Sequence, residues 1–144
     1  MDELMMRMLR WGQKGYSCSQ ILLLLALEDR GQSNPDLVRA MAGLAYGCGS
    51  GRATCGTLTG GCCLLAFFSA KGSDSESPSE HLPVMLQELT DWFDLRVGQT
   101  HGAIACEAIV GEAGPAAARQ TCGAIVAETY GKVMEILAAY GLNV

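Results

Sequence analysis

The feature that most constrains the fold is an unbroken apolar run from Ile21 to Leu27. Ser17 precedes this run as a favourable N-cap and Gly31 follows it as a C-terminal stop, which predicts a helix over residues 18–30. A helix with apolar residues on every side has no face suited to water. We therefore expect this helix to be buried almost all round.

Apolar residues at helical spacing predict further helices, separated by capping residues and glycines. Strand-favouring residues are few, while Leu, Ala, Met and Ile dominate the apolar set. At 144 residues the chain has the size of one domain. We expect a single all-α domain over residues 1–144, a bundle of five to seven helices. The remaining helices are predicted at about 2–11, 35–46, 55–71, 80–93 and 103–110, with a last one from Pro115 or Thr121 to Tyr140.

The charge balance disfavours two classes of partner. The net charge is −5 and the sequence pI is about 4.9. Nucleic acids and anionic membranes bind mainly through Lys and Arg, so neither is expected as a partner. The apolar runs are too short for a transmembrane helix, and the first residues lack the apolar core of a signal peptide. These features predict a cytoplasmic protein.

Seven cysteines make thiol chemistry the leading expectation for function. Structural disulfides are rare in a reducing cytoplasm, and an odd number argues against a disulfide scaffold. Cys18, Cys55 and Cys122 each follow a hydroxyl residue and precede a small residue and an apolar run. This pattern predicts thiols in the first turns of helices, where free N–H groups stabilise a thiolate and lower its pKa.

Cys106 lies near the start of a predicted short helix and supplies a fourth such thiol. Four thiolates converging from helix starts suit an iron-sulfur cluster or a soft metal ion. The candidate ligands of the metal or cluster are therefore Cys18, Cys55, Cys106 and Cys122. No catalytic residue is assigned.

The other cysteines are given different roles. Cys62 and Cys63 lie in an apolar helix and are expected in the core, although Cys62 shares a helix face with Cys55. Cys48 lies in a glycine-rich loop, where we expect it to be exposed and the best alternative redox residue. His101 is expected to be structural. No C-x-x-C motif is present, so neither a thioredoxin-type site nor paired zinc knuckles are predicted.

The order of these residues resembles a known family. Cys18, the segment Cys55-Gly56-Thr57-Leu58-Thr59-Gly60, Cys106 and Cys122 look like the cysteines and the C-G-A-x-x-G motif of the C_GCAxxG_C_C family of redox-active proteins. The resemblance covers essentially the whole chain and nominates the same four cysteines. Thr57 departs from it, because the motif has alanine at that position.

That family is similar to the N-terminal part of split-Soret cytochrome c, and this similarity implies an iron-sulfur cluster. This chain has no haem-attachment motif, so the resemblance implies that any electron partner is a separate redox protein.

The sequence therefore predicts an iron-sulfur protein for electron transfer or redox sensing. Two alternatives stay open: a metal-free dithiol/disulfide oxidoreductase, and a zinc- or copper-binding module without electron transfer. If the protein is an enzyme, it is an oxidoreductase. The apolar first two helices also suggest a homodimer.

Overall fold

The computed structural model describes residues 2–111 and 115–142. Within these two ranges no β-strand forms, and the prediction of an all-α bundle is confirmed. Seven α-helices there have five residues or more: α1 (Glu3–Gln13), α2 (Cys18–Asp29), α3 (Pro35–Met41), α5 (Gly56–Ser69), α6 (Leu82–Phe93), α8 (Cys106–Val110) and α9 (Pro115–Ala139). The shorter elements are a 3-10 turn (Ala42–Leu44), α4 (Ala45–Cys48), a π-helical turn (Asp94–Gly98) and α7 (Gln99–His101).

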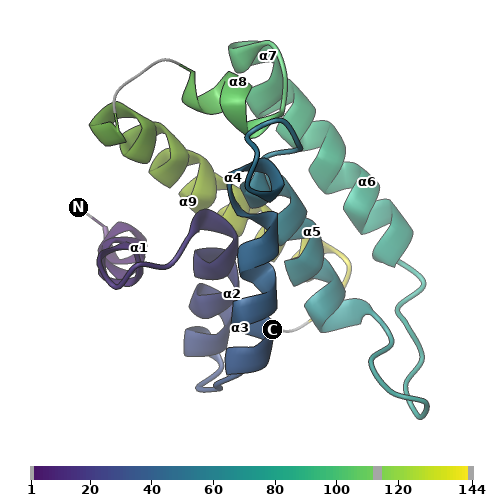
Figure 1. Ribbon diagram of the computed structural model, residues 1–144. Helices are drawn as coiled ribbons and strands as arrows, with labels where there is room; N and C mark the ends of the chain where they lie inside the picture. Colours follow the sequence, from purple (N-terminus) through teal and green to yellow (C-terminus); the bar gives the residue numbers. More distant parts are fainter. Residues whose placement is uncertain (1, 112–114, 143–144) are drawn as a thin grey trace.

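Helix α2 forms the centre of the core, as its apolar run predicts. Leu22 and Leu25 are 0% exposed, and most of the other residues of α2 are also buried. Helix α5 lies beside α2, and α6 and α9 pack against α5 (Figure 1). The crossing of α2 and α5 is close at Gly60, where a Cβ atom would lie 3.2 Å from the Cα of Ser19. The small residue therefore brings the start of α2 against the first half of α5.

The helix predicted over residues 35–46 ends earlier, and this prediction was wrong for its last turn. Helix α3 stops at Met41, whose carbonyl oxygen accepts a 2.7 Å hydrogen bond from the buried hydroxyl of Ser19. A 3-10 turn follows, and Ala45 then has an extended backbone with ψ of 148°. The chain turns here because its carbonyls bond to α2 and no longer continue the helical ladder.

Helix α1 is held to the bundle by a polar network. The guanidinium of Arg7 pairs with Glu28 at 2.7 Å and with Asp29 at 2.9 Å. The hydroxyl of Tyr130 in α9 donates a 2.6 Å hydrogen bond to the same Asp29 carboxylate. One network of ion pairs and hydrogen bonds therefore connects α1, α2 and α9.

Two surface features complete the fold. A polar loop over residues 70–81 connects α5 to α6 and extends to the lower right of Figure 1. Met6 and Leu9 are exposed on α1, and the predicted homodimer stays a prediction. Among the helices in the described ranges, none has both the length and the apolarity needed to cross a bilayer.

Candidate functional site

A left-handed turn lies between α3 and α5. Tyr46, Gly47 and Cys48 have φ values of 57°, 61° and 56°. This conformation is costly for residues with a side chain, so surrounding contacts must hold it. The N–H of Gly51 donates to the carbonyl of Tyr46 at 2.8 Å, and the N–H of Gly49 donates to the carbonyl of Ala45 at 2.9 Å. The glycine-rich loop is thus a fixed structure.

Gly47 brings this turn directly against one of the predicted ligands. A Cβ atom on Gly47 would lie 2.6 Å from the carbonyl oxygen of Ala53 and 3.1 Å from the Cβ of Cys106. The first distance is too short for any side chain. Glycine is therefore required here by its positive φ and by the close approach to Cys106.

A short antiparallel pairing brings Cys55 and Cys106 together. Thr54 bridges Ala105, the N–H of Cys55 donates to the carbonyl of Ile104 at 2.7 Å, and the N–H of Cys106 donates to Ala53 at 3.1 Å. Side chains alternate across such a pairing, so Cys55 and Cys106 lie diagonally on one face of it. In Figure 1 the two segments meet near the top, where α8 lies beside α4.

Cys18 and Cys122 come from two other helices and lie close enough to this pair for the thiol charges to interact. Cys18 is the first residue of α2, and burial and the charge of Cys55 raise its pKa against the lowering effect of Thr57 and of the backbone of Ser19 and Tyr46. Cys122 comes from α9, and its ionisation is opposed by the charges of Cys55, Cys18 and Cys106. We call these four cysteines the four-thiol site.

Their positions in the helices agree with the sequence prediction for three of the four. Cys18 and Cys106 are the first residues of α2 and α8, and Cys55 is the N-cap of α5. Cys122 is not in a first turn, because α9 begins at Pro115, the earlier of the two predicted starts. Thr121 looks like a cap in the sequence but lies inside a continuous helix.

For Cys18, Cys106 and Cys122 the expected lowering of the pKa was wrong. Burial raises the pKa of Cys18, Cys106 and Cys122, and the charges of neighbouring thiols raise each of them further; for Cys122 the pKa reaches about 11. Loss of hydration and repulsion between like charges outweigh the helix N-termini here. The metal-free thiols of these three residues are therefore protonated at neutral pH.

The thiols as they lie do not form a site for a single ion. Among the described residues, no group of three or more His, Cys, Asp or Glu could hold a metal ion. The four cysteines nevertheless lie near enough for their charges to act on one another.

The remaining cysteines lie outside this site. Cys48 is exposed, as predicted. Cys63 is also exposed, so its assignment to the core was wrong, and Cys62 is only half-buried against the core. The segment around them is apolar on all sides, so the sequence does not show which face of α5 turns outwards.

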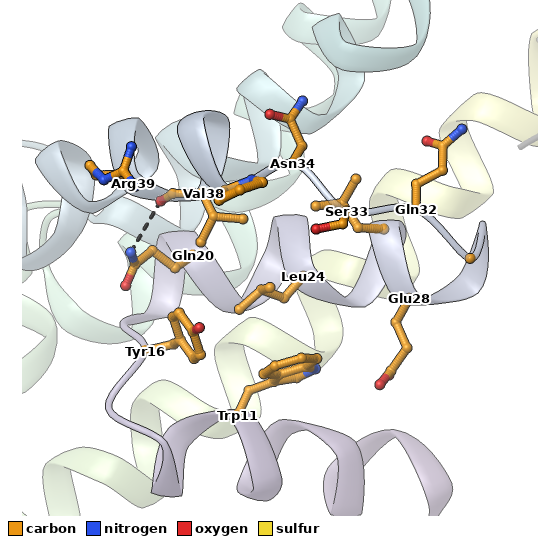
Figure 2. A pocket seen from close by; sticks show the side chains of 13 residues that line it. Trp11, Tyr16, Gln20, Leu24, Glu28, Gln32, Ser33, Asn34, Val38 and Arg39 are labelled. Carbon is orange, nitrogen blue, oxygen red and sulfur yellow. Dashed lines mark hydrogen bonds between the residues drawn. The ribbon is translucent and has the colours of Figure 1, made fainter.

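A groove on the described surface lies away from this site. Figure 2 shows this groove of about 690 Å³ between α1, α2 and α3, with Trp11, Tyr16 and Leu24 along it. The side-chain amide of Gln20 donates to the carbonyl of Val38 at 3.1 Å across its end. None of the described residues that line it is a cysteine. The groove is therefore separate from the four-thiol site.

Fold and site together define a small, all-α, cysteine-rich domain. A family model described as "Putative redox-active protein (C_GCAxxG_C_C)" matches residues 16–136, which include all seven cysteines. The chain therefore belongs to this family of redox-active proteins. No curated protein and no solved structure matches the chain significantly.

Two residues outside the nominated set act on the ionisation of Cys18. Thr57 departs from the family motif, and its hydroxyl in the first turn of the helix was expected to alter hydrogen bonding near the site; it lowers the pKa of Cys18 against the effect of burial. Tyr46 was placed in a helix, and its left-handed conformation depends on tertiary contacts that a sequence pattern does not contain. The one available signal was the glycine-rich segment that follows it.

Proposed function

We propose that this protein binds an iron-sulfur cluster through Cys18, Cys55, Cys106 and Cys122, and that it transfers electrons or senses redox state. The observation that carries the proposal is the bridge of Thr54 with Ala105, which brings Cys55 and Cys106 together on one face of the pairing. Cys18 and Cys122 lie near enough to this pair for their charges to act on it.

A cationic centre would favour the ionised form of the four thiols. Thiolates bound to iron or another metal are deprotonated outright, and the positive charge offsets their mutual repulsion. The raised pKa values of three of these cysteines belong to the metal-free chain; burial is the largest cause of each, and the charges of the neighbouring thiols add to it. When bound, the cluster supplies a one-electron redox couple, and the chain supplies four ligands and a partly water-excluded setting.

The pairing of Cys55 with Cys106 supports a cluster over a disulfide at that pair. Diagonal neighbours in an antiparallel pairing have Cα atoms about 7–8 Å apart. Disulfides need Cα atoms within roughly 4.4–6.8 Å. The two cysteines are therefore near enough to bind one cluster, but their Cα atoms are too far apart for a disulfide unless the backbone moves.

Metal content and colour test the proposal directly. The protein is purified without oxygen, and its iron, sulfide, zinc and copper are measured alongside a visible spectrum. We expect iron with matching sulfide and a brown colour. Zinc or copper without sulfide would favour the metal-binding module instead. A metal-free protein with a reversible disulfide would establish the oxidoreductase and contradict the cluster.

Serine substitutions test the four ligands. Cys18→Ser, Cys55→Ser, Cys106→Ser and Cys122→Ser are each expected to lose most of the iron and the visible absorption, since serine is a poor ligand for this centre. Cys63→Ser is the matched control, because Cys63 is exposed on α5 and lies outside the site. Equal loss in all five variants would contradict the ligand assignment.

A further inference from the structure

The glycine-rich loop over residues 47–53 holds the start of α8 by two backbone hydrogen bonds. The N–H of Cys106 donates to the carbonyl of Ala53 at 3.1 Å, and the N–H of Glu107 donates to the carbonyl of Gly51 at 2.8 Å. These are the first two N–H groups of α8, which have no acceptor within the helix itself. The position of Cys106 therefore depends on the shape of the loop.

A loop of this composition does not hold one shape without internal bonds. Gly47, Gly49 and Gly51 occupy three of its seven positions. All three have positive φ values, of 61°, 82° and 80°. Glycine loses more backbone freedom on folding than any other residue, so the ordered loop has a high entropic cost. Hydrogen bonds within the loop must offset this cost.

Ser50 supplies two such bonds from a single hydroxyl group. Its Oγ donates to the carbonyl of Gly47 at 3.3 Å and accepts the N–H of Arg52 at 3.2 Å. Serine hydroxyls commonly stabilise turns in this way. The first bond fixes the residue that packs against Cys106, and the second fixes the residue between the two carbonyls that hold α8. One side chain thus connects both parts of the loop that contact the start of α8.

We propose that Ser50 is a positioning residue for Cys106. Its hydroxyl holds the glycine-rich loop in the shape that presents two backbone carbonyls to the start of α8. The end of the same loop leads into the pairing of Cys55 with Cys106, so a loop that loses this shape also loosens the pair. The consequence for a bound cluster rests on the proposed function, whereas the effect of the hydroxyl on α8 does not.

Hydrogen exchange measures how firmly the loop holds α8. The backbone amides of Cys106 and Glu107 are followed in the protein as purified, by mass spectrometry with fragmentation to single residues. Ser50→Ala removes the hydroxyl and its two bonds, so exchange of both amides is expected to become about fivefold faster. Ser50→Thr keeps a hydroxyl at the same position and is expected to restore the wild-type rates.

Two controls separate a local effect from a general one. The amide of Leu65, in the buried part of α5, should exchange at the wild-type rate in both variants, because the bundle itself is unchanged. Ser73→Ala removes a hydroxyl that is hydrogen-bonded to that of Ser75 in the exposed loop between α5 and α6. This variant should leave the exchange of Cys106 and Glu107 unaffected.

Iron content gives a second measurement, which depends on the proposed function. Iron per chain is expected to fall in Ser50→Ala and to stay near the wild-type value in Ser50→Thr. A wild-type protein without iron would contradict the cluster, and the exchange rates would still decide the role of Ser50. The two proposals therefore fail independently.

Any of three exchange results would overturn the proposal. Equal rates for Cys106 and Glu107 in the wild type and Ser50→Ala would show that the hydroxyl does not hold α8. Equal acceleration in Ser50→Ala and Ser50→Thr would assign the effect to the size of the side chain and not to the hydroxyl. Faster exchange of Leu65 as well would mean that the whole bundle has lost stability.

Discussion

At the scale of single residues, glycine is required in the left-handed turn for two separate reasons, the positive φ of the backbone and a close contact. Gly47 and Gly49 both have positive φ, at 61° and 82°, so a side chain is strained at either position. Only Gly47 is also crowded, because its Cβ would meet the carbonyl of Ala53, whereas a Cβ on Gly49 would meet nothing within 4 Å. The two positions therefore allow backbone strain to be separated from contact.

Alanine substitutions at these glycines are expected to differ in cost. Gly49→Ala should lose about 1–2 kcal/mol of unfolding free energy through the left-handed backbone alone. Gly47→Ala should lose an additional 1–3 kcal/mol, roughly, because either the turn or the segment of Cys106 must shift. Chemical denaturation measures both losses, and iron content should fall further in Gly47→Ala. Equal losses in the two variants would show that the approach to Cys106 is unimportant.

Cys63 illustrates what a sequence pattern leaves open at this scale. Its neighbours Cys62, Leu64 and Leu65 are all apolar, so periodicity identifies no outer face, and the sequence placed Cys63 in the core. In the structure it is exposed while Leu64 is fully buried. Cys63→Ser is now expected to change the unfolding free energy by no more than about 0.5 kcal/mol in denaturant titrations. A loss of several kcal/mol would restore the core assignment.

At the scale of elements, the crossing of α2 and α5 positions Cys18 against the start of α5. Gly60 lies at this crossing, and a Cβ there would approach Leu22 and Ser19 at 3.1–3.3 Å. Gly131 is also helical, in α9, but a Cβ there would meet nothing within 4 Å. Both glycines cost the helix about the same propensity, so they form a matched pair.

Opposite effects are expected from alanine at these two sites. Gly131→Ala should stabilise the protein by about 0.5–1 kcal/mol through helix propensity. Gly60→Ala should destabilise it by about 1–3 kcal/mol, since the added methyl group forces the two helices apart. Thermal and denaturant unfolding compare the two. Stabilisation by both substitutions would mean that an added methyl group at residue 60 fits between α2 and α5 without moving them apart.

Elements with a decisive local pattern were predicted well, and those defined by contacts were not. The apolar run of α2 implies burial whatever surrounds it, and the structure agrees. The end of α3 depends on the bond from Ser19 to Met41, and the start of α8 beside α4 depends on the pairing of Thr54 with Ala105. Both are tertiary contacts between distant segments. The order of the four nominated cysteines could therefore be read from the sequence, whereas the turn that packs against Cys106 could not.

At the scale of the whole molecule, Tyr130 connects the C-terminal helix to the charges that hold α1. Burial and the hydrogen bond to Asp29 raise the pKa of Tyr130 above its ordinary value of 10.0. The folded state therefore keeps this phenol protonated at pH values where the unfolded chain releases its proton. A raised pKa contributes stability that is fully present below pH 10, about the ordinary value, and that is lost as the pH rises further.

The raised pKa of Tyr130 predicts that the protein loses unfolding free energy at alkaline pH, and that substitution of Tyr130 reduces this loss. The unfolding free energy of the wild type should fall with pH above about 10. In Tyr130→Phe the free energy at neutral pH should be lower by about 1 kcal/mol, since the hydrogen bond to Asp29 is lost, but its fall above pH 10 should be shallower. Tyr46→Phe, which changes an exposed tyrosine outside this network, is the control. Denaturant titrations from pH 7 to about 11 measure the two slopes. Equal slopes of the unfolding free energy against pH in the wild type and Tyr130→Phe would show that the contact between α1, α2 and α9 at Asp29 does not depend on the proton of Tyr130. The alkaline loss would then come from the thiols, whose raised pKa values act in the same direction.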